Sequence, residues 1–250
     1  MDYRLTLFSI VFIAFSCGSK KENHQVAVKV PPEVLVDVTH QKSKSGDNFR
    51  FIHLGNSELN FKTTKPEKDS SSVLLSVAAA FTDLTDFKID GIYLTGGNAF
   101  QKARTNKTLG GGFLKTKEGI TLIDTKKGTL FTDSVLAKYQ EQNADLFQQI
   151  LIIKNGIPET FKAKRNFQRR AIVTTKDDKI YIVENENAVT LAQFCADLVE
   201  LDSTVNNALY LDMGSWDEGW YRYSKDSIVT IGQNKSSTIH QSNWLTFEVK

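Results

Sequence analysis

The stretch from Leu211 to Arg222 holds more chemically useful side chains than any other part of the sequence. It reads LDMGSWDEGWYR and places carboxylates, a hydroxyl, two indoles and an arginine in one loop after an apolar run. Loops at strand ends hold polar groups on a rigid support, and indole faces beside carboxylates suit a sugar ring. Alternatively, Trp216 and Trp220 pack onto the core beneath a surface loop. Composition alone leaves both interpretations open.

Two glycine-rich segments and one arginine-rich segment are further candidates. Gly96-Gly97 and the run 110–112 either bring the backbone close to a ligand or turn the chain, and taken alone they favour a turn. Neither is a phosphate loop, because no Gly-Lys-Ser/Thr completes it. Residues 165–170 (RNFQRR) carry three cations into a β run, where a guanidinium fork suits phosphate or carboxylate. For Arg165 a solvated charge is the favoured interpretation.

The sequence predicts neither a metal site nor nucleic-acid binding. The carboxylates of Asp212, Asp217 and Glu218 match no recognised calcium loop, so no cofactor is expected. With 31 basic against 29 acidic side chains, no basic stripe marks a nucleic-acid surface. The histidines are scattered and have no zinc-ligand spacing: His24, His40, His53 and His240.

The first residues have the pattern of a signal peptide. Arg4 precedes an apolar stretch at 5–15, which is too short to span a bilayer and ends in Ser-Cys-Gly. The segment 14–17 (AFSC) resembles a bacterial lipobox, in which the cysteine is lipidated. A plain secretory signal and a buried strand are the alternatives. We expect residues 1–17 to be a lipoprotein signal peptide and a lipid anchor on Cys17 to hold the protein at a membrane of the bacterial cell envelope, as a periplasmic or outer-membrane lipoprotein.

Residues 18–48 are rich in Lys, Ser, Asn and Gln and are expected to form a flexible tether to a folded domain at 49–250. Within that domain, apolar runs and turn signals predict several strands. They lie near 48–54, 73–81, 113–124 (a hairpin), 151–153, 171–175, 179–183 and 208–212.

Two helices are expected beside these strands. The first begins near Thr132 or Asp133 and runs to about residue 148. The second follows a capping box of Thr190 and Gln193. Its apolar face consists of Leu191, Phe194, Cys195, Leu198 and Leu201, so Cys195 is predicted to be a free core thiol. The fold class expected is α+β, a single domain with a mixed β-sheet and hairpins packed by two main helices.

Four blocks of the sequence, taken together in chain order, resemble the phosphodiester glycosidase family. They are 150–156 (ILIIKNG), 170–183 (RAIVTTKDDKIYIV), 189–198 (VTLAQFCADL) and 207–215 (NALYLDMGS). The last is similar to the family signature Asn-Ala-Leu-Asn/Tyr-Leu-Asp-Gly-Gly-Ser. The resemblance covers roughly residues 70–225. Two departures stand out: Met213 replaces the first glycine after the aspartate, and 78–80 (AAA) replaces Asn and Gly positions.

The resemblance implies a hydrolase that cleaves the sugar–phosphate bond of a glycan or sugar-1-phosphodiester. Arg170 would hold phosphate, and Asp212 would activate water or stabilise the cationic sugar centre. The implied substrate contacts are the donors of Gly96, Gly97, Gly214 and Ser215 and a sugar-stacking ring at Trp216 or Trp220. Because of the two departures, a catalytically inactive glycan-binding lipoprotein is the alternative, and a structural envelope protein is a third class.

Overall fold

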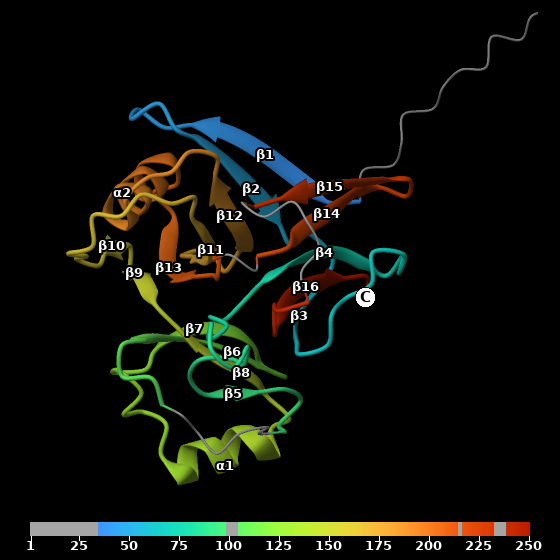
Figure 1. Cartoon of the computed structure of the whole chain (residues 1–250), viewed down its shortest axis with the longest axis vertical. Coiled ribbons are helices and arrows are strands. Elements are labelled where there is room, and N and C mark those ends of the chain that lie inside the picture. The colour runs from blue at the N-terminus through green and yellow to red at the C-terminus, as the bar shows by residue number, and fades with distance from the viewer. Residues whose placement is uncertain (1–34, 99–104, 215–216, 233–238) are drawn as a thin grey trace, which may run out of the picture. The chain divides into compact units, whose positions relative to one another are not determined.

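Strands dominate the structure because most apolar runs are short and bounded by turns. The computed structural model describes residues 35–98, 105–214, 217–232 and 239–250, all within a unit that spans Pro32–Lys250. These residues form sixteen strands and two helices (Figure 1). The α+β expectation therefore holds only broadly, in a mostly β domain.

The strands form three sheets, each with antiparallel pairing between the described strands. The expected mixed sheet is wrong, because the described strands pair only antiparallel, including strands that are distant in sequence such as β2 and β12. The seven-stranded sheet has the order β1 (Asp37–Lys42), β2 (Asn48–His53), β12 (Ile180–Asn185), β11 (Arg170–Thr175), β13 (Val205–Tyr210), β9 (Leu151–Lys154), β10 (Ile157–Pro158).

The other two sheets are smaller. The five-stranded sheet has the order β15 (Ser227–Ile231), β14 (Gly219–Ser224), β4 (Val73–Ala78), β16 (Trp244–Glu248), β3 (Glu58–Lys62). The four-stranded sheet has the order β5 (Tyr93–Leu94), β8 (Asp145–Gln149), β6 (Gly111–Thr116), β7 (Gly119–Asp124). One apolar cluster joins all three sheets through residues such as Ile172, Leu75 and Phe147, each fully buried. Alternation then sends Ala171 and Val173 to the other face of β11.

The second predicted helix is confirmed as α2 (Leu191–Leu201), which covers the outer face of the seven-stranded sheet (Figure 1). The Thr190 side chain caps it by accepting the backbone N–H of Gln193 at 3.1 Å. The Gln193 side chain donates to Asp197 instead, so only half of the capping box forms. Cys195 is a buried free thiol, and burial raises its pKa to about 12.

The first helix is shorter than expected. α1 (Asp133–Glu141) begins after its cap Thr132, but Asn143 takes the left-handed conformation at φ +51° and ends the helical path. Residues 145–149, expected to be helical, form β8. There Leu146 and Phe147 are fully buried on opposite faces of the four-stranded sheet. Burial on both faces favours a strand over an exposed helix end.

The expected tether overlaps the folded domain. β1 lies inside residues 18–48 and pairs with β2 along its length, with Thr39 opposite Phe51. Residues 37–42 therefore belong to a sheet, although their side chains are largely exposed. The expected signal peptide and Cys17 lie outside the described residues. Among the helices that the structure describes, none has the length and apolar character needed to cross a membrane.

Candidate functional site

Asp212 lies where the chain passes from the seven-stranded sheet to the five-stranded sheet. The Leu211 backbone N–H still donates to the carbonyl of Arg170 on β11, at 2.9 Å. One residue later, the Asp212 N–H donates to the carbonyl of Ala79, just beyond β4, at 3.0 Å. Asp212 is thus fixed by backbone contacts to two sheets, a rigid support for a chemical group.

The Asp212 carboxylate accepts two backbone N–H groups, from Gly214 at 2.9 Å and from Thr82 at 3.2 Å. Burial nevertheless raises the pKa of this carboxyl to about 6, and those two donors only partly oppose the effect. A carboxyl that titrates near neutral pH suits proton transfer, since it exchanges a proton under ordinary conditions.

The segment that presents the Thr82 N–H is held by Asn243, which is fully buried. The Asn243 side chain accepts the Ala80 N–H at 2.6 Å and donates to the Ala80 carbonyl at 3.1 Å. The Thr82 hydroxyl lies 2.9 Å from that of Ser242. The sequence had marked 78–80 as a departure from the family motif within a predicted strand, and nothing in the sequence pointed to Asn243.

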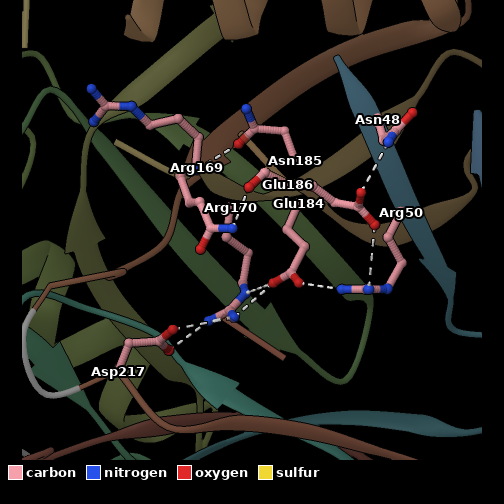
Figure 2. A network of polar contacts seen from close by, with 9 residues as sticks. Asn48, Arg50, Arg169, Arg170, Glu184, Asn185, Glu186 and Asp217 are labelled. Atoms are coloured by element: carbon pink, nitrogen blue, oxygen red, sulfur yellow. Dashed lines mark hydrogen bonds and ion pairs between the residues drawn. The ribbon is translucent and has the colours of Figure 1, made fainter. Parts of the chain in front are cut away.

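Arg170 is enclosed by carboxylates (Figure 2). Its guanidinium donates to Asp217 at 2.7 and 3.3 Å and to Glu184 at 3.0 and 2.7 Å, and the side chain is fully buried. Glu184 also binds Arg50, so charges alternate through four side chains. Burial alone would lower the pKa of Arg170, but the charges of Asp217 and Glu184 outweigh it and raise the pKa.

Two glycines let the backbone approach this ion pair. A Cβ at Gly232, where φ is +88°, would lie 2.1 Å from Asp217 Oδ2 and 2.8 Å from Arg170 Nη2. A Cβ at Gly219 would lie 2.9 Å from the same Arg170 nitrogen. The pair is therefore closed in by backbone, and the donors of Arg170 point at carboxylates. This geometry fits a structural role better than the predicted phosphate contact.

The preceding residue, Arg169, points the other way (Figure 2), as strand alternation requires. Its guanidinium lies 5.1 Å from the centre of the Phe167 ring and 5.8 Å from that of Tyr210. It donates to the Tyr210 hydroxyl at 3.3 Å. Tyr210 in turn feels the charges of both Arg169 and Asp212, with a pKa raised mainly by burial. Arg169 is thus joined to Tyr210, the residue through which it is linked to Asp212.

The remaining predicted site residues are only partly brought together. Gly214 lies next to the Asp212 carboxylate, whereas Ser215 and Trp216 fall outside the described residues. Trp220 is 2% exposed and sits in β14 opposite Ser76, so it packs in the core instead of presenting a face for a sugar.

Gly96 and Gly97 lie at the far end of β8. The Gly96 N–H donates to Asp145, and the Gly97 N–H donates to the Ala144 carbonyl. Asp145 is five residues along the chain from Ile150, whose carbonyl accepts the Tyr210 N–H near Asp212. Five extended residues span about 16 Å. The structure therefore does not bring these glycines to Asp212. In the part of the chain that the structure describes, no cluster of three or more His, Cys, Asp or Glu side chains could hold a metal.

Comparison with known proteins gives structural matches alone. The sequence matches no family model and no curated protein. The fold is similar to the catalytic domain of zebrafish N-acetylglucosamine-1-phosphodiester alpha-N-acetylglucosaminidase, a structure described as auto-inhibited by its pro-peptide. The TM-score is 0.59 at 11% identity, over 90% of this chain and 85% of that one.

A hypothetical protein from Synechocystis is also similar, with a TM-score of 0.51 at 11% identity. The match covers 86% of this chain and 62% of that one. At such identities the likeness shows a shared fold alone.

Proposed function

We propose that this chain is a hydrolase that cleaves the sugar–phosphate bond of a sugar-1-phosphodiester, with Asp212 as the catalytic carboxylate. The observation that carries the proposal is the Asp212 carboxyl itself. It is held by two sheets and two N–H donors, and its pKa lies near 6. The distant fold similarity to a phosphodiester glycosidase domain supports the reaction class.

In the proposed reaction, water adds to the anomeric carbon while the bond from that carbon to the phosphate oxygen breaks. The Asp212 carboxylate takes a proton from the water and stabilises positive charge on the sugar ring. The electrons of the broken bond leave with the phosphate monoester. Because this group is a weak base, a strong general acid is not needed. Thr82 and Gly214 keep the carboxylate in position through their N–H groups.

Arg169 is the better candidate for holding the phosphate, because the donors of Arg170 are directed at Glu184 and Asp217. Three hydrogen bonds occupy Arg169, to Tyr210, to the Val189 carbonyl and to the Arg165 carbonyl. A guanidinium has five N–H donors, so two remain for an anion. Arg169→Lys should raise KM more than it lowers kcat, since lysine keeps the charge but loses the planar fork. An unchanged KM would remove Arg169 from the site.

The test is sugar release by the full chain from a panel of sugar-1-phosphodiesters, with aryl glycosides alongside. We expect release from the phosphodiesters alone, with kcat/KM rising through about pH 6 as Asp212 ionises. Asp212→Asn should lower turnover by about 10²–10⁴-fold. Asp145→Asn is a matched control, because burial also raises the pKa of Asp145 and it also accepts a backbone N–H. Equal losses in both variants would contradict the assignment.

The alternative, a catalytically inactive glycan-binding lipoprotein, has one observation in its favour. Arg170, the cation that the family resemblance assigns to phosphate, is enclosed by carboxylates. A folded chain that binds sugar phosphodiesters, loses that binding in Arg169→Ala and releases no sugar would favour this alternative.

We also propose that a lipid on Cys17 anchors the protein in a bacterial envelope, on the strength of the apolar run and lipobox-like segment at 5–17. Labelling cells with a radioactive fatty acid should mark the wild-type chain and not Cys17→Ala. Equal labelling of both would contradict the proposal.

A further inference from the structure

A groove lies at the opposite end of β13 from Asp212. It has a volume of about 730 Å³ and lies between α1, the β6–β7 hairpin and the turn end of β11–β12. Asn206 in this groove is six residues from Asp212, about 20 Å of extended chain. The groove is therefore separate from the site proposed for hydrolysis, and its volume is typical of small-molecule sites.

Several polar side chains in this groove lack a protein partner. The hydroxyls of Tyr139 and Thr174 and the amides of Gln142 and Asn206 make no side-chain hydrogen bond with the described residues, although each residue is half-buried. Half-buried polar groups without protein partners are left to bind water or a ligand. Two hydroxyls and two amides offer both donors and acceptors, and such a set matches a partner that also carries both.

The apolar and charged parts of the lining narrow the choice of ligand. Leu114, Ile120 and Ile180 are half-buried and give apolar surface beside the amides. The charges are exposed and of mixed sign: Lys138, Glu118 and Asp178. One cation against two carboxylates leaves a net charge of about −1, which disfavours an anion, and because all three side chains are exposed to solvent it attracts a cation only weakly. A neutral molecule with hydroxyl groups on its edges and C–H groups on its faces complements this lining.

We propose that this groove binds a segment of a neutral oligosaccharide, with Tyr139 and Asn206 as the principal contacts. The Tyr139 ring offers a flat apolar face with a polar tip, and Asn206 offers a donor and an acceptor from the facing strand. This inference does not depend on the hydrolysis proposed at Asp212.

The test is isothermal titration calorimetry of the full chain with three neutral hexasaccharides, chitohexaose, cellohexaose and mannohexaose. We expect at least one to bind, and Tyr139→Ala and Asn206→Ala each to weaken it about tenfold or more. Asp212→Asn should bind within twofold of wild type. Failure of all three sugars to bind would overturn the proposal, as would unchanged affinity in both groove variants.

Two further measurements guard the interpretation. Both groove variants must keep the wild-type Tm. Thr121 is an exposed residue that lines the groove, so Thr121→Arg should block sugar binding without disturbing the core. Hexagalacturonate, which is anionic, should bind more weakly than the best neutral sugar, and tighter binding would overturn the claim for a neutral ligand. Sugar release is expected to be lost in Asp212→Asn, and groove binding is expected to be weakened in Tyr139→Ala. Either proposal can therefore fail alone.

Discussion

Asp212 and Asp217 lie five residues apart in one loop, yet their surroundings are opposite. Asp217 is fully buried against Arg170, which donates to both of its oxygens. Asp212 receives N–H groups from the backbone, and burial raises its pKa to about 6. A carboxylate paired with a buried cation joins the elements that carry the two groups. A carboxylate desolvated beside weak donors titrates near neutral pH and is available for chemistry.

The largest expected effect concerns the ion pair of Asp217 and Arg170. Arg170→Met should lower the free energy of unfolding by about 3–5 kcal/mol, because it removes the cation that pairs with the buried Asp217 and leaves Glu184 with Arg50 alone. Urea unfolding at pH 7 measures the change. The double variant Arg170→Met/Asp217→Asn should regain about 1 kcal/mol or more, since it also removes the buried negative charge that Arg170 balances. A loss below about 1 kcal/mol in the single variant would show that Arg170 does not stabilise the loop that carries Asp217.

A smaller loss is expected at the glycine that closes over the pair. Gly232→Ala should destabilise the protein by about 2–3 kcal/mol, because its Cβ would meet Asp217 Oδ2 and the residue has a positive φ. Gly46→Ala is the matched control, since Gly46 has nearly the same φ, +92°, but no atom within 4 Å of the added Cβ. That variant should cost about 1 kcal/mol. Equal losses in thermal unfolding would mean that strain alone, and not the crowded ion pair, accounts for Gly232.

The sequence predicted local elements better than it predicted their partners. The apolar residues of α2 recur at helical spacing after the cap Thr190. The apolar runs of β4 and β6–β7 are bounded by clear turns. Residues 145–148 were assigned to the first helix, and what separates β8 from α1 is the left-handed Asn143. Asparagine favours the left-handed conformation, but this preference is too weak to fix the helix end at Asn143 from the sequence.

The same limit applies to the site. Asp212 stood out because it ends an apolar run, a local feature, and because the segment 207–215 resembles a family signature. The roles of Arg170 and Trp220 depend on residues distant in sequence, Glu184 and Ser76, which no spacing along the chain reveals. Arg169 and Arg170 are adjacent and chemically identical, so only strand alternation decides which one faces carboxylates and which one faces Tyr210.

The last expected effect is on the free energy of unfolding at Asp212, and its sign is opposite to that of the losses at Arg170 and Gly232. In the unfolded chain an aspartate titrates near 3.9, whereas burial raises the pKa of Asp212 in the fold to about 6. Between these values folding takes up a proton, so stability falls as pH rises from about 4 to about 6 and stays reduced above it. Asp212→Asn removes this loss and should raise the free energy of unfolding by about 2–3 kcal/mol at pH 8 and by about 0.5 kcal/mol or less at pH 4. Urea unfolding across that range measures the difference, and Asp145→Asn provides the comparison at a remote carboxyl with a raised pKa. A variant that is less stable than wild type at pH 8 would place Asp212 with Asp217, as a carboxylate that the fold needs in its charged form.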